Sequence, residues 1–335
     1  RLIRERFPQI PAWPQLPRKN RYENMYAQFS ERFPGITFDN GNMYVDRRKD
    51  LDRDLEHLYL AYLEDQLEYG RLSPGYAAGL ESMANSDPPF LQEPLAVKGQ
   101  VTGPVSWGLT VVDQNRRPIL YDEILADAVG KHLRLKAACQ ERQLAQLASR
   151  TLIMVDEPYM ASFGSAFVAL GRDQVVELLE EVFAGLKGLR GIHCCGNTDW
   201  SILLSTSLDV LSLDAYDYGQ TLSLYAEDVA RFLEDGGIIA WGIVPAGIAA
   251  ENESVQSLLA RLEDRIDLLV AKGVSREAIL AAGMVTPSCG LGSLTPPPAE
   301  RIFDLTVGVS AEMRRRYVSA VADDAVVATT AGEAA

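Results

Sequence analysis

One histidine and three of the four cysteines of this chain fall in two short stretches that could bind a metal ion. The first, His193-Cys194-Cys195, ends an apolar run that begins at Leu189, and the second contains Cys289. If the first stretch is a β-strand, His193 and Cys195 point to one face and Cys194 to the other. One imidazole and two thiolates are ligand types that zinc prefers, and three protein ligands with an open position are typical of a catalytic zinc.

The same residues also allow a purely structural interpretation. Cysteine is among the residue types most often buried, and two adjacent cysteines in an apolar strand are commonly small hydrophobic side chains. Cys289 lies far downstream in the sequence, so its spacing from His193 fixes no ligand geometry. On these residues alone, a metal site and an ordinary buried strand both remain open.

The composition excludes several classes of protein. The chain has 335 residues, of which 47% are hydrophobic and 23% charged, which suits one large α/β domain or two smaller ones. Its formal net charge of -14 argues against nucleic acid or an anionic membrane surface as a partner, because both require clustered Lys and Arg.

The cysteine count and the hydropathy pattern predict where the protein works. Four cysteines, two of them adjacent, do not suit a secreted domain held together by disulfides. The sequence has no apolar run near the ~20 residues that span a bilayer, and it does not open with a signal-peptide pattern. We therefore expect a cytoplasmic protein.

The order of the predicted elements indicates the fold. Apolar runs that read as strands alternate with amphipathic, helical segments, and polar candidate residues follow several of the strands. The predicted strands cover residues 10–16, 95–101, 151–155, 189–194, 210–213, 237–243 and 281–285. The predicted helices cover residues 18–33, 50–69, 121–150, 173–186, 200–206, 223–234, 254–272 and 298–317.

This alternation predicts a (β/α)8 TIM barrel whose active site lies at the carboxyl ends of the strands. We expect residues 1–318 to form a single barrel domain and the alanine-rich residues 319–335 to form a flexible tail. Seven strands are predicted instead of eight. A doubly wound open sheet is the alternative, although no Gly-x-Gly-x-x-Gly turn follows an early strand.

The chain resembles the superfamily of uroporphyrinogen decarboxylase and cobalamin-independent methionine synthase, and in particular its zinc-dependent thiol methyltransferases. Five stretches occur in the family's order over nearly the whole chain. They are Lys98-Gly99-Gln100-Val101-Thr102-Gly103-Pro104, Asp156-Glu157-Pro158, His193-Cys194-Cys195, Val210-Leu211-Ser212-Leu213-Asp214 and Pro287-Ser288-Cys289-Gly290. The family's first strand, which contains Gly-Ser-x-Pro, is absent, and this would account for the eighth strand that is missing from the prediction.

The resemblance implies a set of metal ligands. His193, Cys195 and Cys289 match the zinc ligands of the catalytic half of methionine synthase. Asp214 occupies the position of the family's glutamate ligand and is one methylene shorter. The string from His193 to Asn197 is also similar to the methylcorrinoid:coenzyme M methyltransferases, which share the barrel and the zinc.

The departures from the family point to the methyl donor. The chain is too short for the duplicated N-terminal barrel of the folate-using synthases, and Gly242-Ile243-Val244-Pro245 lacks the histidine that those enzymes use in methyl transfer. The resemblance therefore implies methylcobalamin or a methylated corrinoid protein as donor, in place of methyltetrahydrofolate.

Two carboxylates are the candidates for holding the acceptor. Asp156 resembles the catalytic-site carboxylate that contacts the amino group of homocysteine in the synthases, and Glu157 lies beside it. The sulfonate of coenzyme M would be repelled by these carboxylates, which favours homocysteine. The alternative for Asp156 is a cap on a helix or loop, a common task for an Asp before Pro.

The sequence thus predicts a zinc-dependent methyltransferase that makes methionine from homocysteine with a methylcorrinoid donor. A first alternative keeps the fold and the zinc but methylates coenzyme M or another small thiol. A second is a metal-free decarboxylase of the uroporphyrinogen type, against which the three zinc-ligand residues speak. A third is a barrel that carries a corrinoid or a metal without turnover.

Overall fold

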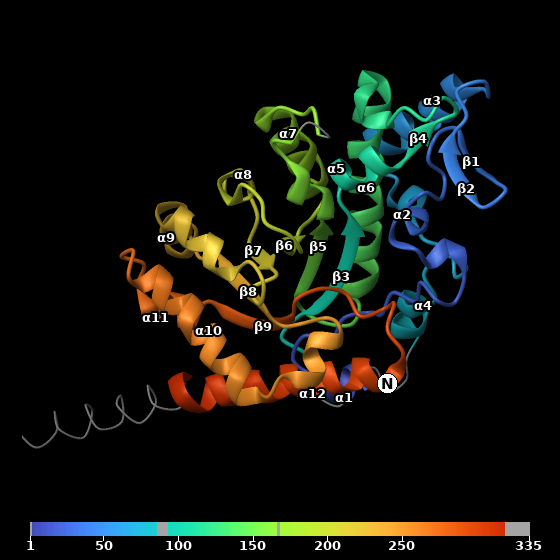
Figure 1. Cartoon of the computed structure of the whole chain (residues 1–335). Helices are drawn as coiled ribbons and strands as arrows, with labels where there is room; N and C mark the ends of the chain where they lie inside the picture. The colour runs from blue at the N-terminus through green and yellow to red at the C-terminus, as the bar shows by residue number, and fades with distance from the viewer. Residues whose placement is uncertain (1, 86–92, 166–167, 319–335) are drawn as a thin grey trace, which may run out of the picture. The chain divides into compact units, whose positions relative to one another are not determined.

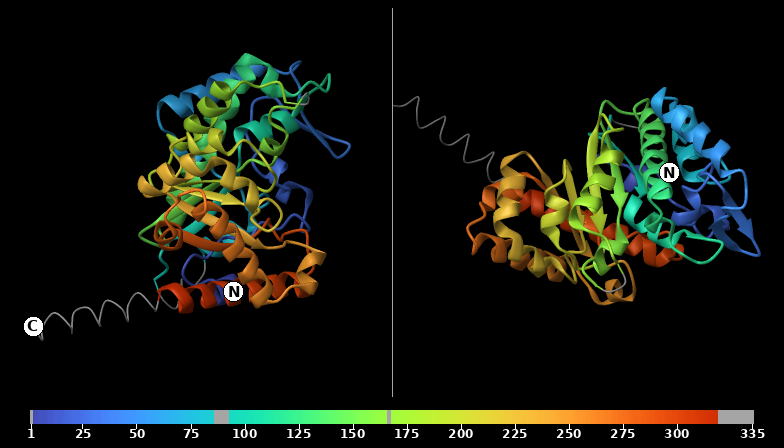
Figure 2. Two further views of the ribbon diagram at one scale, coloured as in Figure 1. Left: turned by 60° about the vertical axis from the view of Figure 1, so that its left-hand side comes forward. Right: turned by 90° about the horizontal axis from the view of Figure 1, so that it is seen from above.

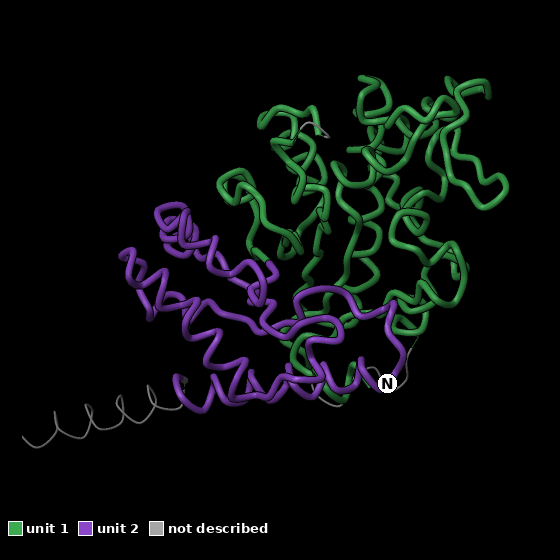
Figure 3. The backbone as a smooth tube through the Cα atoms, viewed as in Figure 1, with its two compact units in different colours: residues 1–212 green, residues 213–335 purple. Residues whose placement is uncertain are grey.

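The computed structural model describes residues 2–85, 93–165 and 168–318 (Figure 1). The tail of residues 319–335, which we expect to be flexible, lies outside the described residues. The chain divides into two compact units, residues 1–212 and residues 213–335 (Figure 3). None of the helices in the described part of the chain has the length and apolar character needed to cross a membrane.

Six strands form the main sheet. Their order is β3 (Val97–Thr102), β5 (Thr151–Asp156), β6 (Leu189–Cys194), β7 (Val210–Leu213), β8 (Ile238–Val244) and β9 (Gly283–Pro287). The pairs β3–β5, β5–β6 and β8–β9 are parallel, and helices connect successive strands. This is an α/β fold with a curled, six-stranded half-barrel sheet among the described residues, consistent with a TIM-barrel-like fold. The sequence predicts seven strands and a complete (β/α)8 barrel.

The predicted first strand, residues 10–16, is reduced to a single bridge beside β3. Ala12 pairs with Lys98 in parallel, the amide of Trp13 donates to the Lys98 carbonyl at 3.3 Å, and the Lys98 amide donates to the Pro11 carbonyl at 2.9 Å. Prolines 11 and 14 flank this bridge, and because proline has no N–H the ladder cannot extend through them. The prediction located the segment correctly but overestimated its length.

The side chain of Gln140 pairs with the backbone of Gln100 in the middle of β3. Its Oε1 accepts the Gln100 amide at 2.9 Å, and its Nε2 donates to the Gln100 carbonyl at 2.9 Å. The helix that carries it, α6 (Glu123–Leu144), packs against β3, β5 and α7 (Arg172–Phe183), as Figures 1 and 2 show. One helix thus packs against β3 and β5 and satisfies the backbone groups of Gln100.

The other helices of the first unit are short, apart from α3. They are α1 (Leu2–Arg6), α2 (Met25–Gln28), α3 (Leu51–Leu63), α4 (Ala78–Ala84), α5 (Pro104–Thr110) and α8 (Trp200–Leu204), with 3-10 turns at Arg21–Glu23, Leu67–Gly70, Ile119–Tyr121 and Pro158–Ser162. The helices predicted over residues 18–33 and 50–69 are therefore shorter and interrupted. No helix was predicted where α5 lies.

A second, three-stranded sheet was not predicted. Strand β1 (Ile36–Asp39) and β2 (Asn42–Val45) form an antiparallel hairpin, and β2 pairs in parallel with β4 (Val112–Asp113). The hairpin turns at Asn40 and Gly41, whose φ angles of 46° and 84° belong to the left-handed region. An Asn-Gly pair between two apolar runs is the strongest short-range hairpin signal, so this element was readable from the sequence.

The second unit contains the last strands and helices α9 (Ala226–Glu234), α10 (Val255–Val270), α11 (Arg276–Ala281) and α12 (Pro296–Met313), with 3-10 turns at Gly219–Tyr225 and Ile248–Asn252 and a π-helical turn at Arg314–Val318. Ser254 and Ser257 form a capping box at the start of α10. Strand β9 begins two residues later than predicted, because Ala281 still belongs to α11.

Candidate metal site at the carboxyl ends of the strands

The carboxyl ends of three neighbouring strands bring Thr102, Asp156 and His193 into one row. Thr102 is the register partner of Asp156, and Asp156 is the register partner of His193. Register partners of a parallel pair point to the same face, so the three side chains share one face of the sheet. Met154 and Gly191, two positions before Asp156 and His193, lie on this face as well, because a Cβ added to Gly191 would point at the Sδ of Met154. We call this the inner face of β3, β5 and β6.

His193 has one ring nitrogen held and the other without a partner. Its Nδ1 lies 3.0 Å from the hydroxyl of Ser212, at the end of the next strand. Its Nε2 is buried and has no hydrogen-bond partner within the described part of the chain. If Nδ1 carries the proton and donates it to Ser212, Nε2 presents a lone pair, which is the state in which imidazole binds metals.

The two adjacent cysteines differ as strand alternation predicts. Cys194 is completely buried, its thiol lies 3.5 Å from the Gly196 carbonyl, and burial raises the pKa of this thiol to about 12. Cys195 is only partly buried. A buried thiol with a high pKa is a poor metal ligand, because metals bind the thiolate. Cys195, and not Cys194, is therefore the ligand candidate.

Cys289 follows the end of β9 in a turn that Ser288 fixes. The Ser288 amide donates to the Val244 carbonyl at 2.8 Å, and the Ser288 hydroxyl accepts the amide of Ala246 at 3.1 Å. The Cys289 side chain is exposed, which keeps its sulfur accessible to a ligand.

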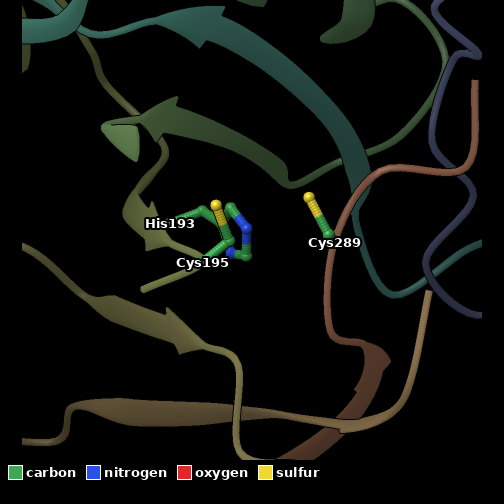
Figure 4. Close-up of side chains that lie close together, drawn as sticks. All are labelled: His193, Cys195 and Cys289. Carbon is green, nitrogen blue, oxygen red and sulfur yellow. The ribbon is translucent and has the colours of Figure 1, made fainter. Parts of the chain in front are cut away.

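Three potential ligand atoms come together. The imidazole of His193 and the sulfurs of Cys195 and Cys289 offer atoms that all lie within 4.8 Å of one another (Figure 4). Zinc binds nitrogen at about 2.0 Å and sulfur at about 2.3 Å, so two ligands of one ion lie within roughly 4.6 Å of each other. Small side-chain adjustments would therefore place all three atoms on one ion.

Asp214, the fourth predicted ligand, does not belong to this group. It follows β7, its side chain is buried, and its carboxylate accepts the amide of Asp217 at 2.9 Å. Burial raises the pKa of Asp214 to about 6, and the charge of Cys289 contributes in the same direction. Cys289 is thus near enough to be felt electrostatically, and the role of Asp214 as a ligand stays a prediction.

Glu157 has a task that the sequence did not indicate. Its carboxylate is fully buried and accepts the amides of Val105 at 2.9 Å and Ser106 at 2.8 Å, together with the Ser106 hydroxyl at 2.5 Å. These donors belong to the first turn of α5, so Glu157 caps that helix. Its amide also donates to the His193 carbonyl at 2.8 Å. Its part in binding a substrate stays a prediction.

Three residues of the first unit near this site were missed. Ser212 supports His193, and Lys98 shares the inner face with Asp156. Burial raises the pKa of the third residue, Tyr26, and the charges of Glu157 and Cys195 act in the same direction. Ser212 and Lys98 carried a signal, since each is a polar residue inside an apolar strand.

Comparisons with known proteins establish the fold only. No family model matches the chain, and no curated protein matches it. Among solved structures, a methyltransferase from Methanosarcina mazei matches with a TM-score of 0.58 and 14% sequence identity, over 94% of this chain and 82% of that one. At this identity the likeness shows a shared architecture.

Proposed function

We propose that this protein is a zinc-dependent methyltransferase that moves a methyl group from a methylated corrinoid to the thiol of homocysteine, forming methionine. The observation that carries the proposal is the convergence of His193, Cys195 and Cys289 within 4.8 Å. The Methanosarcina mazei protein of the same fold is named a methyltransferase, which supports the reaction class.

The donor set suits zinc. The unpartnered Nε2 of His193 is a nitrogen ligand already oriented by Ser212, and Cys195 and Cys289 provide two sulfurs. Three protein ligands leave a coordination position for a substrate, as in catalytic zinc sites. When bound, zinc would keep the sulfur of an acceptor thiol deprotonated at neutral pH, where a free thiol of pKa about 8.5 is mostly protonated.

The protein's own residues would position the acceptor. Asp156 lies beside His193 in the row of strand ends, so its carboxylate can bind an amino group while the acceptor's sulfur lies near the ligand group. The acceptor thiolate then attacks the methyl carbon of the donor. The new S–C bond forms as the C–Co bond breaks, and the electron pair of that bond remains on cobalt.

The experiment combines metal content with turnover. Purified protein is assayed for bound zinc and incubated anaerobically with methylcobalamin and homocysteine, while the cobalamin spectrum is followed. Cys195→Ser and Cys289→Ser should lose most of the zinc and the spectral change. Cys194→Ala is the matched control and should keep both, because its sulfur is buried on the opposite face. A wild-type protein that binds zinc but produces no spectral change, and no methionine, would refute the proposed reaction.

A further inference from the structure

Lys98 lies on the inner face, two positions before Gln100 and four before Thr102. Its register partner on β5 is Leu152, on the same face as Asp156. The Cβ direction of the next residue, Gly99, toward Gln140 and Leu144 of α6, confirms that Lys98 points away from α6. A cationic side chain therefore projects from β3 on the same side as Asp156 and His193.

The ammonium of Lys98 has few partners. Its Nζ donates to the Oε1 of Gln100 at 3.3 Å, a long bond to a neutral amide. Within the described residues it makes no ion pair at 4.0 Å or less. Burial lowers the pKa of Lys98, and the charge of Asp156 acts in the opposite direction. An ammonium has three donors, so Lys98 retains hydrogen-bonding capacity in a poorly hydrated place.

A desolvated charge is costly unless an opposite charge pairs with it. The charge of Asp156 reaches Lys98, but no carboxylate among the described residues lies within ion-pairing distance of its Nζ. A ligand that supplies a carboxylate or a sulfonate would complete the charge balance.

We propose that Lys98 is a specificity-determining residue, whose ammonium binds an anionic group on the acceptor thiol at the end remote from the sulfur. The inference rests on the proposed function, because it assigns an acceptor to the same site. The shared chemistry is a small thiol with an acidic tail, and its two sources are a carboxylate, as in homocysteine, and a sulfonate, as in coenzyme M. Asp156, on the same face of the sheet as Lys98, favours an acceptor that also carries an amino group.

The test measures thiol binding directly, so that it does not depend on methyl transfer. Zinc-loaded protein is titrated calorimetrically with homocysteine, with 2-mercaptoethanesulfonate, and with 3-mercaptopropylamine, which is homocysteine without its carboxylate. The variants are Lys98→Met, Lys98→Arg and Lys136→Met. Lys136 is the matched control, because it is a fully buried lysine of α6 whose Nζ has no hydrogen-bond partner among the described residues.

We expect Lys98→Met to lower the affinity for the acidic acceptor about tenfold or more, because the charge pair between the ammonium and the acidic group is lost. The affinity for 3-mercaptopropylamine, which has no acidic group, should stay within about twofold of the wild-type value. Lys98→Arg should recover most of the affinity, and Lys136→Met should not change it. A loss confined to homocysteine identifies the carboxylate as the ligand, and a loss confined to the sulfonate identifies coenzyme M.

Several results would overturn the assignment of Lys98. They are equal losses for all three thiols, no loss in Lys98→Met, or a wild-type protein that binds none of the three. A wild-type protein that binds homocysteine through Lys98 but transfers no methyl group would refute the proposed reaction and leave the Lys98 assignment intact. Methyl transfer in Lys98→Met with an unchanged KM for homocysteine and also for 2-mercaptoethanesulfonate would refute the Lys98 assignment alone.

Discussion

Asp156 and His193 are register partners on the adjacent parallel strands β5 and β6. Their side chains therefore lie side by side on one face, held by the backbone ladder of the sheet and not by a loop. The amide after Asp156, that of Glu157, continues this ladder by donating to the His193 carbonyl at 2.8 Å. A carboxylate that can bind a cationic group and an imidazole that can bind a metal are thus fixed relative to each other.

Asp156→Asn should separate acceptor binding from metal binding. We expect the KM for homocysteine to rise about tenfold or more, because a charge-assisted hydrogen bond to the amino group is weakened. The zinc content should not change, since Asp156 is not one of the three clustered ligands. Asp173→Asn, an exposed position in the first turn of α7, is the matched control. Loss of zinc in Asp156→Asn would instead make Asp156 part of the metal site.

Ser212→Ala should weaken metal binding without removing a ligand. The Ser212 hydroxyl lies 3.0 Å from Nδ1 of His193, and loss of such a supporting hydrogen bond typically costs 10- to 100-fold in metal affinity, so about that effect is expected. Zinc affinity can be measured by competition with a chromogenic chelator. Ser212→Thr keeps the hydroxyl and should bind zinc more tightly than Ser212→Ala. Equal affinities in wild type and Ser212→Ala would show that Ser212 does not orient the imidazole.

The sequence predicted the strands that carry the site better than their surroundings. Residues 189–194 and 210–213 were predicted with the bounds that the structure has. Val210–Leu213 is buried at every position, as expected of a strand covered on both faces. The period of two also separated Cys195 from Cys194 correctly. These features depend only on local alternation.

The missed features have two different causes. The hairpin at Asn40-Gly41 and the start of α5 at Gly103-Pro104 had local signals, a left-handed turn pair and a proline in the first helical turn, that were not used. The capping of α5 by Glu157 and the support of His193 by Ser212 join residues far apart in sequence. No periodicity encodes such contacts, so only the folded structure could reveal them.

Glu157 should make stability depend on pH. Burial raises its pKa from 4.5 to about 7, and the donors of Ser106 and Val105 offset this only in part. Between these two pH values the folded protein holds a proton that the unfolded chain has released. The contribution of Glu157 to the unfolding free energy is therefore largest below about pH 4.5 and falls as the pH rises through about 7.

Urea unfolding of wild type and Glu157→Gln between pH 4.5 and 8 measures this effect. The unfolding free energy of wild type minus that of the variant should decrease by about 2 to 3 kcal/mol up to pH 7 and then level off. Glu177→Gln, an exposed position on α7, should show no such trend. A difference that is independent of pH would mean that the Glu157 carboxylate is charged throughout this range.

Gly103→Ala should disturb the same cap from the other side. A Cβ on Gly103 would lie 2.2 Å from Oε1 and 2.3 Å from Cδ of Glu157, so the carboxylate would have to leave the amides of Val105 and Ser106. Buried amides without an acceptor cost about 1 to 3 kcal/mol, and we expect a loss of unfolding free energy in this range.

Because Glu157→Asp shortens the side chain that Gly103→Ala displaces, the double variant should lose less unfolding free energy than the sum of the two single variants. Gly75→Ala, whose Cβ would meet no atom within 4 Å, is the control and should be nearly neutral. Strict additivity of Gly103→Ala and Glu157→Asp would show that the two positions do not share the contact that the structure places between them.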